Sequence, residues 1–184
     1  MGRKKILPLI LCFLMLASCA PPGSAGFGVR EKYEAMPELS LKALVRVDFG
    51  DRILDFSVNY TCDPEGKGRI EVISPESIAG IEAEVGDAHS LTYQGTTLEL
   101  GALAGTGLSP MECLPLMVSD WSLGYLTGAF REKQGTRNVL TLTYRSRRQV
   151  TVFEHTAYFD PDTLAPISGE LYIDGNCVVT VWYE

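Results

Sequence analysis

The chain has 184 residues, of which 46% are apolar and 21% are charged, and it carries a formal net charge of −7. This length and this apolar content fit one globular domain. A negative balance without a dense basic stripe repels phosphate backbones, which argues against nucleic acid as a partner.

The N-terminus has the pattern of an export signal. Arg3, Lys4 and Lys5 precede an apolar run from Ile6 to Leu16, which is too short to span a bilayer as a helix. The sequence Leu16-Ala17-Ser18-Cys19 follows and resembles the lipobox of bacterial lipoproteins. That resemblance implies removal of residues 1-18 and attachment of diacylglycerol and an N-acyl group such as palmitate to Cys19. A generic signal peptide that happens to contain a cysteine is the alternative.

The mature chain begins with a segment rich in Pro, Gly, Ser and Ala. Residues 19-28 are therefore predicted to be the lipidated cysteine and a flexible tether, and residues 29-184 a single domain. A short helix is predicted over Val29 to Leu39, because Val29, Tyr33 and Met36 share one face.

Apolar and polar residues then alternate with a period of two, which is typical of half-buried strands. Turn residues such as Gly50-Asp51 separate these runs into hairpins. The predicted strands in this half lie around residues 41–49, 54–61, 70–72, 81–85, 91–93 and 96–100.

The middle of the chain interrupts the strands. Gly101 to Gly107 is predicted to be a loop, and it lacks the lysine and Ser/Thr of a phosphate-binding loop. Ser109-Pro110-Met111-Glu112 is typical of a helix start, with serine as cap and proline in the first turn. Pro115 predicts that this apolar helix is short or kinked before Trp121.

Strands return in the C-terminal half, where Asp174-Gly175 is a strong hairpin signal. The last strand is apolar on both faces, which predicts that it is covered on both sides and is not an exposed edge. The predicted strands are Gly124–Glu132, Asn138–Tyr144, Val150–Phe159, Ser168–Asp174 and Cys177–Tyr183.

Sequential hairpins with few helices indicate an α+β fold: a curved antiparallel β-sheet, or half-open barrel, with a short N-terminal helix and a helical insertion covering the concave face. The sequence leaves open whether the concave face encloses a cavity or is a filled core.

Several stretches between residues 30 and 184 resemble the LolA-like superfamily, and within it exported lipoproteins of the spore-germination GerS type. They are the run from Ile70 to Gly80, Leu91-Thr92-Tyr93-Gln94-Gly95, Leu108-Ser109-Pro110, and Phe159-Asp160-Pro161-Asp162-Thr163. The superfamily contains acyl-chain carriers, sensors and regulators that grip another protein, so the fold does not choose among them.

The resemblance also implies a location. Ala20 is not the aspartate associated with inner-membrane retention, which implies the outer membrane in a two-membrane cell. In a one-membrane cell it implies the outer face of the plasma membrane, and the germination likeness favours that case.

The residues give little support for catalysis, so the chain is predicted not to be an enzyme and to need no cofactor or metal. His89 and His155 lie on separate strands, and His155 is interpreted as a cross-strand polar residue. Asp160 and Asp162 lack the further oxygen ligands of a calcium loop and indicate a hydrogen-bonded turn. The three cysteines of the domain, Cys62, Cys113 and Cys177, are predicted to be buried free thiols, although one disulfide is possible.

Two non-catalytic functions remain. The favoured one is a regulatory lipoprotein that presents a surface or an exposed strand edge to an extracytoplasmic protein. Its candidate contacts are Arg145, Arg147 and Arg148, for which a solvated turn is the simpler interpretation. The alternative is a site for an acyl chain or another hydrophobic ligand in the concave face. Its candidate lining residues are Phe56, Val58, Val72, Met111 and Met117.

Overall fold

A computed structural model describes residues 24–48, 50–63, 66–85, 89–93, 96–100, 110–148 and 151–184. Eleven strands of these residues form one sheet in the order β6-β5-β4-β3-β2-β1-β11-β10-β9-β8-β7. The strands are β1 (Leu39–Asp48), β2 (Ile53–Cys62), β3 (Gly68–Ser74), β4 (Glu82–Val85), β5 (His89–Tyr93), β6 (Thr96–Leu100), β7 (Tyr125–Gln134), β8 (Arg137–Arg148), β9 (Thr151–Phe159), β10 (Pro166–Ile173) and β11 (Asn176–Tyr183). The sheet is open, with β6 and β7 as its two edges.

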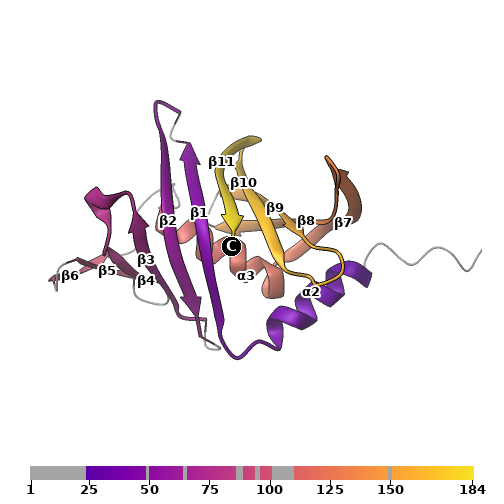
Figure 1. The fold of residues 1–184 in the computed structure, drawn as a ribbon, viewed down its shortest axis with the longest axis horizontal. Coiled ribbons are helices and arrows are strands. Elements are labelled where there is room, and N and C mark those ends of the chain that lie inside the picture. The colour runs from indigo at the N-terminus through magenta and orange to yellow at the C-terminus, as the bar shows by residue number, and fades with distance from the viewer. Residues whose placement is uncertain are drawn as a thin grey trace, which may run out of the picture.

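Two helices accompany the sheet, α2 (Ser24–Glu34) and α3 (Pro110–Leu123), with a single 3-10 turn η1 (Glu76–Ile78). Figure 1 shows α3 between the two halves of the curved sheet and α2 beneath β9 and β10. The predicted fold class is therefore confirmed: every strand pairing is antiparallel, and the helical insertion lies between β6 and β7 in the chain. Within the described residues, no helix is long and apolar enough to cross a bilayer.

Alternation along each strand decides which side chains meet α3. Ala43, Val45 and Val47 of β1 are buried, whereas Arg46 and Asp48 between and beyond them are exposed. The buried face of the sheet and the apolar side chains of α3 together make one core cluster. This burial provides the main stabilisation of the fold, because a fully buried aliphatic side chain contributes about 1.5–3 kcal/mol.

The N-terminal helix starts earlier than predicted. It spans Ser24–Glu34, so the tether prediction is wrong for residues 24–28, and residues 19–23 lie outside the described part of the chain. Packing explains the difference, because Val29 is fully buried and a β-carbon at Gly26 would collide with the Leu126 side chain. A glycine that lowers helix propensity thus allows α2 to lie directly against β7.

The second helix is not short, which was one of the two alternatives that Pro115 predicted. Its predicted cap, Ser109, lies outside the described residues, but from Pro110 the helix runs 14 residues with Pro115 inside it. A proline so close to the start removes only one of the first hydrogen bonds of the helix, which explains why the helix continues.

The last strand corrects another expectation. β11 pairs with β1 on one side and β10 on the other, so it is indeed not an edge. It is not covered on both sides, however, because Trp182 is 38% exposed on the outer face, where Arg46 lies 5.5 Å from its ring centroid. The described helices cover the concave face, and the outer face of this strand is left to solvent.

The three described cysteines are thiols, but they differ in burial. Cys113 is buried as predicted, Cys62 is half-buried and Cys177 is exposed, so the prediction of buried thiols is wrong for Cys177.

The turn between β9 and β10 is organised by Asp160, as the sequence predicted. Its Oδ1 accepts hydrogen bonds from the backbone N–H groups of Asp162 and Thr163, at 3.2 and 2.9 Å, and from the Thr163 hydroxyl at 2.9 Å. These bonds, the backbone N–H of Thr163 foremost, lower the pKa of Asp160 from 3.8 to about 2.

We therefore expect Asp160→Asn to weaken the loss of folding stability that the wild type shows as the pH falls below about 4. Because the folded-state pKa is depressed, the carboxylate stabilises the fold above about pH 4, and this contribution is lost as the pH falls through about 2. Thermal unfolding between pH 2 and pH 5 measures the effect, with Asp162→Asn as the matched control. Equal acid limbs in the wild type and Asp160→Asn would contradict this account.

Candidate binding groove

A groove lies where α2 and α3 meet the strands β2 and β4. Its volume is about 470 Å³, within the range of sites that bind small molecules or single side chains of a partner. It is lined by Tyr33, Glu34, Met36, Leu39, Tyr60, Cys62, Asp63, Gly66, Val85, Pro115, Leu116, Val118, Ser119, Ser122 and Leu123.

The apolar part of the groove is held in place by the core. Leu116 and Val118 of α3 are 7% and 6% exposed, and Tyr60 of β2 is 2% exposed. Burial, and then a hydrogen bond with Cys62, raises the pKa of Tyr60, so its hydroxyl stays neutral. This wall is rigid and presents carbon surface together with neutral polar groups.

Tyr33 forms the wall contributed by α2. Its hydroxyl donates a hydrogen bond to the carbonyl of Leu164 at 2.9 Å, and its ring centroid lies 4.8 Å from that of Trp121. Burial raises the pKa of Tyr33 to about 12. The side chain is therefore fixed at both ends and can act as a preformed surface.

The charged lining residues of the groove are acidic. Glu34 is exposed at the end of α2, and Asp63 follows β2. The carboxylate of Asp63 accepts a hydrogen bond from the backbone N–H of Lys67 at 2.8 Å, which holds it in the turn. Among the described lining residues there is no lysine, arginine or histidine, so the groove favours cationic over anionic groups.

The predicted hydrophobic-ligand residues lie elsewhere. Val58, Val72 and Met117 are 5%, 1% and 0% exposed, and all three belong to the core between the sheet and α3. Phe56 is half-buried against that core, and Met111 lies in the first turn of α3 with its side chain outside the described part. Val58 also borders a second hollow of about 330 Å³, whose other lining residues include Lys42, Ser57 and Ile73. Of these residues, Val58, Val72 and Met117 are core residues in the described structure, and the hydrophobic-ligand site stays a prediction.

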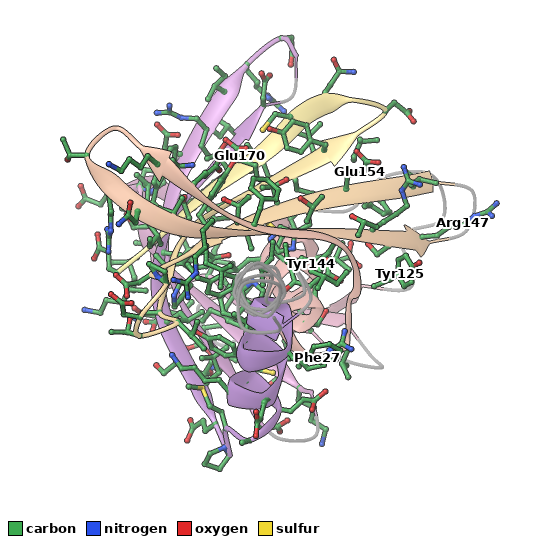
Figure 2. The ribbon with its side chains drawn as sticks, turned by 90° about the vertical axis from the view of Figure 1, so that its right-hand side faces the viewer. Phe27, Tyr125, Tyr144, Arg147, Glu154 and Glu170 are labelled. Atoms are coloured by element: carbon green, nitrogen blue, oxygen red, sulfur yellow. The ribbon has the colours of Figure 1, made fainter. Side chains whose placement is uncertain are left out.

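The arginine cluster lies at the end of β8. Arg145 donates to Glu154 at 2.6 Å across the strand pair β8–β9, and Arg147 is exposed (Figure 2). The Arg148 side chain and all of Cys19 lie outside the described residues. Arg145 is therefore part of a surface ion pair, which contributes little to stability.

Sequence reasoning missed a buried polar pair. His155 Nδ1 lies 3.3 Å from Asp120 Oδ2, and the two residues are 1% and 4% exposed. His155 pairs across the sheet with Tyr144 and Leu171, as a cross-strand residue does, but it points into the core. The sequence signal for this burial is the alternation along β9, which places the histidine on an otherwise apolar face. The residues of that face are Phe153, His155, Ala157 and Phe159.

This pair is closed off from the groove. A β-carbon built on Gly169 would lie 3.2 Å from His155 Nε2 and 3.4 Å from the Tyr183 hydroxyl, so the β10 backbone covers both atoms. Neither atom has a hydrogen-bond partner within the described structure. Among all the residues that the structure describes, no group of three or more metal-ligating side chains occurs. The arrangement is that of a structural pair joining α3 to the sheet.

No protein-family model matches the sequence, and no curated protein sequence matches it. Solved structures do resemble the fold. One is a LolA-superfamily protein from Nitrosomonas europaea, at 10% identity and TM-score 0.44, covering 86% of this chain and 91% of that one. Another is a putative outer membrane lipoprotein-sorting domain from Vibrio parahaemolyticus, at 9% identity and TM-score 0.48, covering 86% and 88%.

A third similar structure is that of the CwlD amidase from Clostridioides difficile in complex with the GerS lipoprotein. The identity is 20% and the TM-score 0.45, covering 90% of this chain and 95% of the matched one. LolA-superfamily proteins and lipoproteins are thus among the structural neighbours of the chain. The similarity is one of chain fold and assigns no ligand.

Proposed function

We propose that this chain is a membrane-anchored extracytoplasmic lipoprotein that acts by binding and not by catalysis. Its groove between α2, α3 and the sheet would hold an apolar, positively charged segment of a partner protein. The observation that carries this proposal is the combination of a preformed apolar wall with an acidic rim at Glu34 and Asp63.

Charge favours one of the two non-catalytic functions that the sequence leaves open. A groove of about 470 Å³ has room for part of an acyl chain, but a fatty acid carboxylate would meet Glu34 and Asp63. The net charge of −7 adds to that repulsion and attracts a basic segment. On the concave face, Val58 and Val72 of the sheet are buried in one core with Met117 of α3, which disfavours an acyl chain at these residues. A protein segment is therefore the favoured occupant.

The anchor is proposed from the N-terminal sequence. Lipidation of Cys19 would hold the domain at the outer face of the plasma membrane, or at the outer membrane of a two-membrane cell. An anchored domain must act on partners that come to it, which suits local regulation better than transport between membranes. A role in germination rests on the sequence resemblance alone.

Photo-crosslinking of the full chain in membranes tests whether a partner protein occupies the groove. A photoreactive amino acid at Ser122, in the groove, is compared with one at Asn176, which is exposed at the start of β11. We expect one protein adduct from Ser122 and none from Asn176, with the adduct identified by mass spectrometry.

Charge reversal makes the test specific. Glu34→Lys with Asp63→Lys is expected to lower the Ser122 adduct about tenfold, since two reversed rim charges cost about 1.4 kcal/mol together. Asp174→Lys, an exposed reversal on another turn, should leave the adduct unchanged. Equal adducts from the two probe positions, or insensitivity to the rim charges, would refute the groove. Uptake of a fluorescent fatty acid that rises in the rim variant would instead support the hydrophobic-ligand function.

A further inference from the structure

Three large side chains are exposed where α2 meets the corner between α3 and β7. Phe27 of α2 is 68% exposed, Leu123 at the end of α3 is 81% exposed, and Tyr125 at the start of β7 is 73% exposed. We call these three residues the anchor-side patch. In Figure 2, which looks at this end of the molecule, Phe27 and Tyr125 project on the same side of α2.

Two contacts hold this corner together. The guanidinium of Arg30, one helical turn after Phe27, donates a hydrogen bond to the carbonyl of Gly124 at 2.5 Å. On the neighbouring face of α2, Gly26 lies directly against Leu126 of β7. The patch therefore belongs to a junction that holds the backbone of α2 close to the turn between α3 and β7.

The anchor would attach beside this patch. Five peptide steps separate Cys19 from Ser24, where α2 begins, so the chain between them reaches at most about 18 Å. Phe27 follows within the first turn of that helix. A lipid on Cys19 thus confines the α2 end of the domain to the neighbourhood of the bilayer surface.

The surroundings of the patch suit lipid headgroups. Tyr125 stands opposite Arg145 in the β7–β8 register, and Arg147 is exposed further along β8. Glu154 pairs with Arg145, so the attraction to anionic headgroups is moderate. Tyrosine with neighbouring arginines is a combination enriched at membrane–water interfaces.

We propose that the anchor-side patch docks on the phospholipid bilayer and so orients the lipidated domain. This inference rests on the proposed lipidation of Cys19. A bilayer is the favoured occupant because three side chains are far fewer than the roughly 20–30 residues per side of a stable protein interface. The lipid on Cys19 would hold the domain at the bilayer without fixing its orientation, and an apolar contact would fix that orientation. Since Leu123 also borders the groove, docking places the groove mouth beside the membrane.

Fluorescence of the full lipidated chain tests the docking. The chain is reconstituted in phosphatidylcholine–phosphatidylglycerol vesicles, with and without brominated acyl chains as quenchers. Tyr125→Trp is compared with Ile53→Trp, since Ile53 is 58% exposed on the β1–β2 hairpin, which Figure 1 places at the opposite end from α2. Both variants share the background of Trp121 and Trp182.

We expect the added fluorescence of Tyr125→Trp to shift to the blue and to be quenched, and that of Ile53→Trp to show neither change. Phe27→Ser added to Tyr125→Trp should lower the ratio of docked to undocked protein about tenfold, because the variant loses the burial of one large apolar side chain on docking.

Three results would overturn the inference, and they differ from one another. If the protein binds the vesicles but both variants are quenched equally, the docking is refuted and the lipid anchor is not. A blue shift that depends on protein concentration and not on lipid assigns the patch to a second copy of the chain. If the wild-type protein is not recovered with the vesicles, both the lipid anchor and the docking are refuted.

Discussion

Replacing Trp121 by alanine is expected to lower the free energy of unfolding by about 4 kcal/mol, the loss typical of a large aromatic removed from a core. Trp121 is fully buried, and its ring centroid lies 4.8 Å from Tyr33, 5.4 Å from Phe159 and 5.3 Å from Tyr183. The side chain therefore joins α3 to α2, β9 and β11 at one point. Urea unfolding followed by circular dichroism measures the change.

Trp182→Ala is the matched control for this prediction. Trp182 is 38% exposed on the outer face of β11, and its loss should cost about 2 kcal/mol, because it removes less buried area and leaves no enclosed cavity. Similar losses in the two variants would show that the aromatic cluster does not hold α3 on the sheet. A stable Trp121→Ala protein with a new apolar cavity would, in addition, be tested for uptake of small apolar molecules.

The second large effect is expected from His155→Leu, which should destabilise the fold by about 3 kcal/mol. The substitution leaves the carboxylate of Asp120 at 4% exposure without the partner that stands 3.3 Å away in the wild type. An unpaired buried carboxylate costs far more than the hydrogen bond itself contributes. The same unfolding experiment reports the loss.

A double replacement separates the pair from simple packing. His155→Leu with Asp120→Leu removes both polar groups and should recover most of the stability, since apolar residues often substitute well for a buried pair. Glu154→Gln, at the exposed neighbour of His155, should change the stability by about 0.5 kcal/mol or less. If the double variant is as unstable as the single one, the cost lies in misfit and not in the orphaned carboxylate.

Trp121 and the His155–Asp120 pair matter for function because they hold α3 against the concave face of the sheet. Trp121, Asp120 and Met117 all belong to α3, and each is buried against the sheet. The helix is therefore held against the concave face by its buried side chains. The described groove lies at the edge of this helix, where Leu116 and Ser122 line the wall.

Much of the fold could be predicted from the sequence. Period-two alternation predicted β1 and β9, and the turn residues Asp174-Gly175 predicted the hairpin between β10 and β11. These features depend on a few neighbouring residues and on backbone geometry, so they are visible in a short window of sequence. The lipidation site at Cys19 comes from local pattern as well and stays a prediction.

Other features depended on contacts between distant segments. Gly26 was predicted to belong to a tether, but it lies in a helix against Leu126 of β7. Trp182 was predicted to be covered, but it is 38% exposed on the outer face of β11. The groove is similar, since Glu34, Asp63 and Ser122 come from three separate parts of the chain.

Local pattern was therefore enough for the strands, the hairpins and the helical insertion, because each depends on the conformational preferences of adjacent residues. Packing across the chain determined where α2 begins, which side chains of α3 are buried against the sheet, and where an acidic groove opens. Burial of a side chain is a property of everything packed around it, and for His155, Asp120 and Trp121 those neighbours come from segments that only the folded chain brings together.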